Sequence, residues 1–233
     1  MASRTSPRVA KRNRPSTPRR SDGKKILGNR KNLNERVRNG LELRNELAAD
    51  MTAAARVRSL TCSFIRHGDM STLLEEVLSA AIEVTHADFG NIQLLNPETE
   101  TLRIVAHSGF TPKFLEYFDE VHIGEAACGT AMKTRQQILV EDVTNSPVFR
   151  DAKTIEVILE AGIRGVQSTP LTSRSGEFVG MISTHYRVPW LPSERELRML
   201  DTIARLAADF IEWKMQNPMH EARAAFPSPA TVS

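Results

Sequence analysis

The chain has 233 residues, of which 40% are hydrophobic and 25% are charged, a composition expected of one globular domain with extensions. It contains no run of about 18 apolar residues, which excludes a membrane-spanning helix, and its start lacks the apolar segment of a secretory signal peptide. Cys62 and Cys128 are the two cysteines, too few for a disulfide scaffold or a cysteine zinc site, so we expect a cytoplasmic protein.

The net charge of +3 conceals a strongly basic start and an acidic remainder. Residues 1–31 hold 11 lysines and arginines against one acid, Asp22, whereas the rest of the chain holds 20 basic and 27 acidic residues. Because this start has few apolar side chains to bury, we predict a disordered basic tail over residues 1–31. Such an arm can bind nucleic acid, but without interleaved aromatic residues we expect at most weak, sequence-independent binding.

Residues 32–67 have the spacing of a helix with one narrow apolar stripe. A stripe this thin does not supply the face of a globular core, so it predicts a coiled coil or a dimer helix. The apolar residues recur mostly at three-, four- or seven-residue intervals, as one helix face requires; they are Leu33, Val37, Leu41, Leu47, Met51, Ala54 and Leu60.

The next segment predicts a helix followed by a β-hairpin. Ser71 is the expected cap of a helix that runs to about Thr85, and strands are expected over residues 91–96 and 102–109. Asn91, Gln93 and His107 are polar residues within these strands. Short helices near residues 112–118 and 128–132, a strand over 137–140 and a helix over 154–161 are predicted to follow.

Residues 165–187 predict a second hairpin, with a turn at residues 173–176 that ends in a glycine. Small hydroxyl groups, an amide and an imidazole recur in these otherwise apolar strands. The two-residue period of a strand is consistent with Gln167, Thr169, Ser183 and His185 on one face of the sheet. Because buried polar groups need partners, that face is predicted to be wet, covered by a polar loop, or one wall of a ligand pocket.

The last helix is predicted to begin after Ser193, which stands at capping-box spacing from Glu196, and to end near Lys214. It carries two apolar stripes, whereas a sheet covers only one face of a helix. We therefore predict that the second stripe packs against a partner subunit through Met199, Leu206, Phe210 and Trp213. Residues 215–233 are polar and contain prolines, so we expect a disordered tail there.

With these residues in view, the chain resembles a GAF domain, in particular the sensory GAF modules of bacterial two-component signalling proteins. The resemblance rests on ADFGNIQLLNPETETLRIVAHSGF (87–110), ACGTAMKTRQQILVEDV (127–143) and the stretch from AGIRGVQSTPL to the last helix (161–213). It implies an α+β domain over residues 68–214, with a central antiparallel sheet of about six strands. Helices would cover one face, and loops and short helices would cover a ligand pocket on the other.

The resemblance also implies a signalling role, with dimerisation through the terminal helices and an output partner such as a histidine kinase. The ligand is expected to be a small molecule that the sequence does not identify, and no cofactor is assigned. We predict that the pocket is lined by polar strand residues together with two residues of the covering segment. They are Asn91, Gln93, His107, Gln167, Thr169, Ser183 and His185, with Phe110 and Cys128.

Two alternatives to a binding module stay open. Cys128 stands near the start of a short helix, where a thiolate is favoured, so a cysteine-dependent redox enzyme or redox sensor is one alternative. A buried structural thiol is the simpler interpretation. The other alternative is a nucleic-acid-associated regulator that uses the basic arm. We find no metal-ligand spacing among His107, His122 and His185 and no catalytic constellation, so we predict a protein that is not an enzyme.

Overall fold

The structure, a computed structural model, describes residues 20–67, 69–149 and 151–217. The predicted disorder of residues 1–19 and 218–233 therefore lies outside the described residues. The chain divides into two compact units, Met1–Met51 and Thr52–Ser233. In order, the elements are α1(Arg20–His67), α2(Met70–Thr85), β1(Phe89–Asn96), β2(Thr101–Ser108), α3(Pro112–Tyr117), β3(Glu120–Val121), α4(Ala126–Thr134), β4(Ile138–Val140), the 3-10 turn η1(Val143–Asn145), α5(Ala152–Glu160), β5(Gly165–Thr172), β6(Phe178–Tyr186) and α6(Glu194–Gln216).

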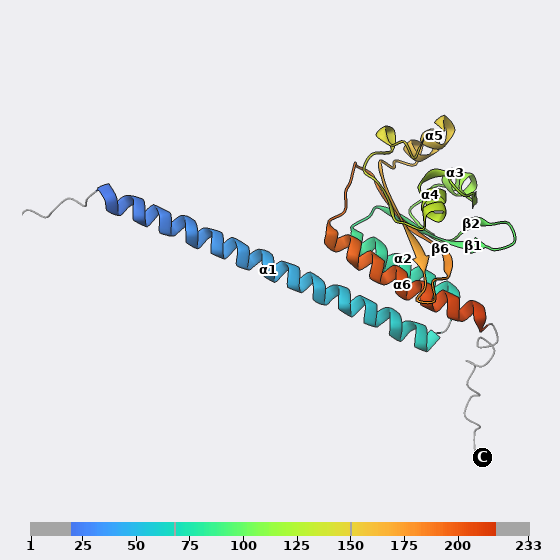
Figure 1. Cartoon of the computed structure of the whole chain (residues 1–233), viewed down its shortest axis with the longest axis horizontal. Helices are drawn as coiled ribbons and strands as arrows, with labels where there is room; N and C mark the ends of the chain where they lie inside the picture. Colours follow the sequence, from blue (N-terminus) through green and yellow to red (C-terminus); the bar gives the residue numbers. More distant parts are fainter. Residues whose placement is uncertain (1–19, 68, 150, 218–233) are drawn as a thin grey trace, which may run out of the picture. The chain divides into compact units, whose positions relative to one another are not determined.

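The described part of the first unit is helical and belongs to α1, which spans 48 residues (Figure 1). This helix begins at Arg20, so residues 20–31 are helical where we expected disorder. Helix propagation is much less costly than nucleation, and the lysines, arginines and leucine of this segment are good helix formers. The predicted apolar stripe is largely exposed within the unit: Leu33 and Val37 are 59% and 55% exposed, and Leu47 and Met51 are 60% and 67% exposed.

The second unit is built on a six-stranded antiparallel sheet with the strand order β3-β2-β1-β6-β5-β4. Both predicted hairpins are present, as β1–β2 and β5–β6. Strand β1 also pairs with β6 in the middle of the sheet, so the first and the last strands of the chain are neighbours. The predicted fold class, α+β with an antiparallel sheet and helices on it, is confirmed.

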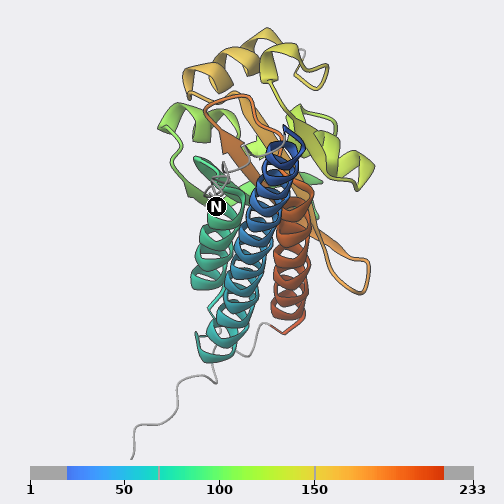
Figure 2. The same ribbon diagram turned by 90° about the vertical axis from the view of Figure 1, so that its left-hand side faces the viewer.

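Helices α2 and α6 cover one face of the sheet and enclose one of its two apolar cores (Figure 2). Asp69, rather than the predicted Ser71, caps α2, because its carboxylate accepts a hydrogen bond from the Thr72 amide at 2.8 Å. The predicted capping box of α6 is present between Ser193 and Glu196. These caps satisfy amide groups that a helix start leaves without intrahelical partners.

The second stripe of α6 is partly covered within the chain. Met199, Leu206 and Phe210 are half-buried against the helix-side core, which also contains Leu60 from the end of α1, whereas Trp213 is 39% exposed. The predicted dimer residues are therefore not left as an open apolar surface. Sequence periodicity does not reveal that Leu60, at the end of α1 and within the second unit, contributes to this core.

The opposite face of the sheet is covered by α3, α4 and α5, which we call the roof. Roof and sheet enclose a second core rich in aromatic side chains, among them Phe89, Phe114, Phe118 and Phe149. The two faces therefore differ in construction: long helices pack on one, and short helices joined by loops pack on the other (Figure 1). Short helices and the loops that join them generally open locally more readily than long packed helices.

Candidate functional site

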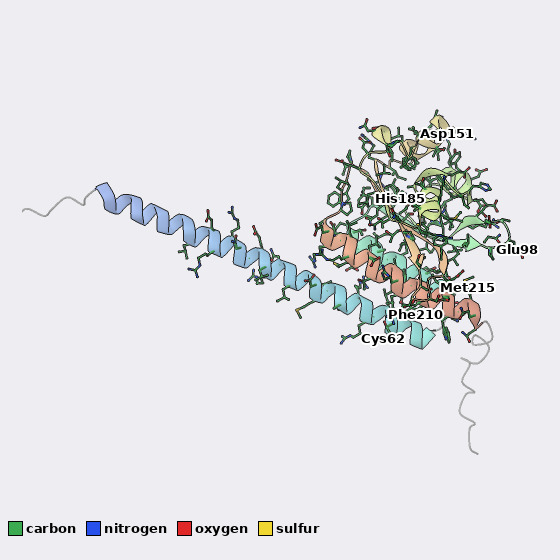
Figure 3. All side chains as sticks on the ribbon, viewed as in Figure 1. Cys62, Glu98, Asp151, His185, Phe210 and Met215 are labelled. Carbon is green, nitrogen blue, oxygen red and sulfur yellow. The ribbon has the colours of Figure 1, made fainter. Side chains whose placement is uncertain are left out.

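A small cavity lies between the roof and the centre of the sheet. Its volume is about 20 Å³, close to the space that a single water molecule needs. His185, labelled in Figure 3, lies at this level between the sheet and the roof. The residues around the cavity are Asn91, Gln93, Phe114, Phe118, Ala126, Ala127, Cys128, Phe149, Ile158, Val166 and His185.

Strand register explains why β1 and β6 present polar side chains to the roof. Asn91 stands opposite Ser183, and Phe89 stands opposite His185. Residues directly opposite in an antiparallel pair share a face, and residues two apart along a strand return to it. Asn91, Gln93, Ser183 and His185 therefore belong to the same face, together with the roof-packed Phe89, which agrees with the prediction for these four.

The predicted placement of Gln167 and Thr169 is wrong, because the register of β5 puts its other set of residues under the roof. Ser168 stands opposite Ser183, whereas Thr169 stands opposite Ile182, a residue of the helix-side core. Thr169 accepts a hydrogen bond from Gln137 Nε2 at 2.7 Å and lines a separate cleft of about 680 Å³ beside α6. Ser168 is the roof-side residue that the sequence pattern did not identify.

His107 and Phe110, which we predicted to line the pocket, are not among the residues that line the cavity. His107 stands opposite Asn91 in the register, but its side chain is exposed. Phe110 stacks on Phe114 with ring centroids 4.2 Å apart and meets the edge of the His185 ring at 5.0 Å. Phe110 thus supports the wall of the cavity from behind Phe114.

Several buried polar atoms at the cavity have no hydrogen-bond partner among the described residues. They are Asn91 Oδ1, both amide atoms of Gln93 and His185 Nδ1. Asn91 and Gln93 are only 2% and 1% exposed, so bulk water does not satisfy these atoms. An unpaired buried polar atom costs about 1–3 kcal/mol, so each of these atoms calls for an explanation such as a bound water or ligand.

Burial also fixes the protonation state of His185. Desolvation lowers the pKa of its imidazole from 6.5 to about 3, because the charged form loses hydration in this apolar surrounding. None of the described residues around the cavity is an acid that would offset that loss. His185 is therefore a neutral ring at physiological pH, able to donate a hydrogen bond through one nitrogen and accept one through the other.

Cys128 lies at the third position of α4 and is packed between two serines. Its Sγ is 3.5 Å from Ser183 Oγ and 3.7 Å from Ser168 Oγ, and the two hydroxyl oxygens are 2.9 Å apart. Burial is the largest influence on this thiol and raises its pKa above 9.0. The thiolate that redox chemistry requires is thereby disfavoured.

An open cleft of about 930 Å³ lies on the outer side of the roof, around α4 and the start of α5. It carries both signs of charge, from residues such as Glu125, Asp151 and Lys153. Asp151, labelled in Figure 3, caps α5 by accepting a hydrogen bond from the Thr154 amide at 2.7 Å. Phe118, Ala126 and Phe149 line this outer cleft and the inner cavity alike.

Across residues 20–67, 69–149 and 151–217, no group of three or more His, Cys, Asp or Glu side chains is arranged to hold a metal ion. Nor does the described part of the chain contain a helix that is both long and apolar enough to cross a membrane.

Comparison with known proteins identifies relatives of this arrangement. The family described as "GAF domain" matches residues 67–212. A methyl sulfide methyltransferase-associated sensor from Methanosarcina acetivorans is 27% identical over 93 residues, which make up 40% of this chain and 9% of that sensor. The chain therefore corresponds to only a small part of that relative's length.

Solved structures share the fold at lower sequence identity. A domain assigned to a two-component sensor histidine kinase protein from Sinorhizobium meliloti is 24% identical, with 68% of this chain and 99% of that domain covered and a TM-score of 0.55. The GAF domain of a phosphoenolpyruvate-protein phosphotransferase from Coxiella burnetii is 17% identical, with coverages of 72% and 97% and a TM-score of 0.61. Free methionine-R-sulfoxide reductase from Neisseria meningitidis, in complex with its substrate, is 16% identical, with coverages of 71% and 93% and a TM-score of 0.57.

Proposed function

This chain belongs to the GAF domain family, and from that premise we propose that it is a sensory module whose ligand is a small molecule that places an uncharged group beneath the roof. The observation that carries this proposal is the set of unpaired polar atoms on Asn91, Gln93 and His185 around one cavity. A ligand with donors and acceptors in matching positions would remove the cost of leaving these atoms unpaired. A charged ligand group would instead lose its hydration there without a counter-ion.

The direct test is native mass spectrometry of the full chain, purified without denaturation and compared with the same protein after unfolding and refolding. A bound molecule of uniform mass, lost on unfolding, is the expected result. A molecule that carries a formal charge on the part enclosed by the cavity would contradict the proposed ligand class.

Gln93→Met provides a sharper test, with Gln167→Met as its matched control. Each glutamine is 1% exposed with both amide atoms unpaired, but Gln93 lies under the roof and Gln167 on the helix side. Each substitution should raise the free energy of unfolding by ~1–3 kcal/mol, because methionine has similar length and no polar atoms to leave unpaired. Urea denaturation measures this gain.

The two variants should differ in ligand recovery. Gln93→Met removes groups that the ligand is proposed to contact, so the amount of co-purified molecule should fall sharply, whereas Gln167→Met should retain it. Equal recovery from the two variants would show that the ligand lies elsewhere.

We propose ligand binding rather than catalysis for this cavity, because its single thiol is held protonated by burial and no second cysteine lies beside it among the described residues. The redox alternative would require a thiolate that the surroundings of Cys128 disfavour. The output of the module is proposed to pass to a partner protein such as a histidine kinase, the kind of protein to which the similar Sinorhizobium meliloti domain is assigned.

We further propose that the chain forms a homodimer through the apolar stripe of α1. Leu47 and Met51 are 60% and 67% exposed within their unit, an arrangement that a second copy of the helix would cover. Leu47→Glu combined with Met51→Glu should raise the dissociation constant of the dimer about a hundredfold or more, since each buried apolar side chain contributes ~1.5–3 kcal/mol. Sedimentation velocity measures the change.

Leu43→Glu is the control, because Leu43 lies outside the stripe. A wild-type chain that stays monomeric at high micromolar concentration would refute the proposal.

A further inference from the structure

The inner cavity and the outer cleft are separated by a thin partition of aromatic side chains. Phe118 and Phe149, with Ala126 between them in chain order, are the residues that line both spaces. Phe149 is 5% exposed and Phe118 is 8% exposed, so the partition is closed. The inner space of about 20 Å³ accommodates one water molecule, whereas the outer space of about 930 Å³ is open to solvent.

This difference in size has a consequence for binding. Small-molecule sites in proteins usually enclose about 300–1,000 Å³, far more than the inner cavity offers. We propose that Phe118 and Phe149 form a gate, and that their displacement joins the cavity and the cleft into one ligand site. The proposal rests on the proposed binding function and adds to it the path of access and the residues that control it.

The positions of the two gate residues suit such a movement. Phe118 is the C-terminal cap of α3, a helix of only six residues. Phe149 lies in the loop between η1 and α5, where its amide donates to the Ser146 carbonyl at 3.3 Å, a long hydrogen bond. Each ring can therefore move with a short loop or helix end, while the sheet that carries Gln93 and His185 stays in place.

The two joined spaces specify the chemical class of the ligand. The inner part offers neutral donors and acceptors from Asn91, Gln93 and His185 between aromatic walls, which fits an uncharged planar group. The outer part contains charges of both signs, among them Lys153, whose ammonium lies 5.5 Å from the Tyr117 ring centroid. A planar uncharged group joined to a polar or charged group that remains in the cleft is thus the class of molecule that the site would take.

Cys128 provides a built-in reporter of the gate, because its buried thiol lines the inner cavity. In a Cys62→Ser background, the full chain is treated with iodoacetamide at pH 8.5, and alkylation of Cys128 is followed by mass spectrometry. Phe149→Ala should label about tenfold or more faster than the wild type, because labelling follows the population of open molecules.

Phe114→Ala is the matched control, since Phe114 lines the inner cavity but not the outer cleft. It removes a phenyl ring of the same size without truncating either gate residue, although this ring packs on Phe118 at 4.7 Å between centroids, so it should label more slowly than Phe149→Ala. Phe149→Leu, a milder truncation, is tested alongside and should give an intermediate rate. Equal labelling of the Phe149 and Phe114 variants, at rates that follow their global stabilities, would overturn the gate.

The uncharged character of the inner site is tested by the ratio of iodoacetamide to iodoacetate labelling at Cys128. In the folded wild type this ratio should exceed the ratio at the same residue in urea-unfolded protein, and an equal ratio would contradict the assigned class. If Cys128 is labelled in the expected pattern but the purified chain contains no ligand, the result would count against the binding function alone. Failure of the labelling pattern in a chain that does hold a ligand would count against the gate alone.

Discussion

Replacing Gly180 with alanine is expected to destabilise the protein by at least ~3 kcal/mol, at the upper end of what overpacking usually costs. An added Cβ at this position would lie 2.1 Å from the carbonyl oxygen of Gln93 and 3.1 Å from the Cα of Leu94. Both contacts are with backbone of the neighbouring strand, so no side-chain rotation relieves them. Because β1 and β6 pair at the centre of the sheet, separating them would disturb the hydrogen bonds that join the two hairpins.

Denaturant unfolding of Gly180→Ala, or its loss from the soluble fraction, measures this effect. Gly40→Ala is the control, because nothing lies within 4 Å of a Cβ built at Gly40 in α1. That change should be neutral or stabilise the helix, since glycine in a helix interior costs about 0.5–1 kcal/mol relative to alanine. A Gly180→Ala variant as stable as the wild type would mean that β1 and β6 do not approach as closely as the structure has them.

Local signals in the sequence predict the main elements of the second unit, whereas the six-stranded sheet and its two covered faces were expected only from the resemblance to GAF domains. Alternating strand residues around two turn sequences predicted both hairpins, and the Ser193–Glu196 spacing predicted the start of α6. These features depend on neighbours in the chain, which is why they can be read without the fold. The cap of α2 was misassigned because Asp69 and Ser71 are both good capping residues within one turn.

The candidate site was predicted less completely, because its composition depends on register and on contacts between distant segments. In β5, Gln167, Ser168 and Thr169 are all polar, and successive residues of a strand face opposite sides of the sheet. The pattern alone therefore does not reveal whether Ser168 or the other two residues face the roof. Pairing of Ser168 with Ser183 decides it. Phe118 and Phe149 carried no signal beyond being aromatic residues near loops, since their role arises only where the roof closes over the sheet.

Acid is expected to destabilise the protein in a pH range that burial of His185 sets. In the unfolded chain the imidazole binds a proton near its ordinary pKa of 6.5, whereas in the folded protein burial lowers the pKa to about 3. As the pH falls from 6.5 to 3, the unfolded state therefore gains a proton that the folded state does not take up. Stability is lost by up to ~1.4 kcal/mol per pH unit, or ~5 kcal/mol in all, and this loss ends below pH 3.

His185→Asn removes this contribution, so its stability should depend less steeply on pH than that of the wild type between pH 6.5 and 3. Urea denaturation across this range measures the difference between the two proteins, which cancels the carboxylates that they share, such as Asp142, whose pKa is lowered to about 2 beside Arg164. His107→Asn, at an exposed position of β2, is the control and should keep the acid sensitivity of the wild type. Parallel pH profiles for His185→Asn and the wild type would show that His185 takes up its proton in the folded protein, and that the cavity admits water or a counter-charge to the ring.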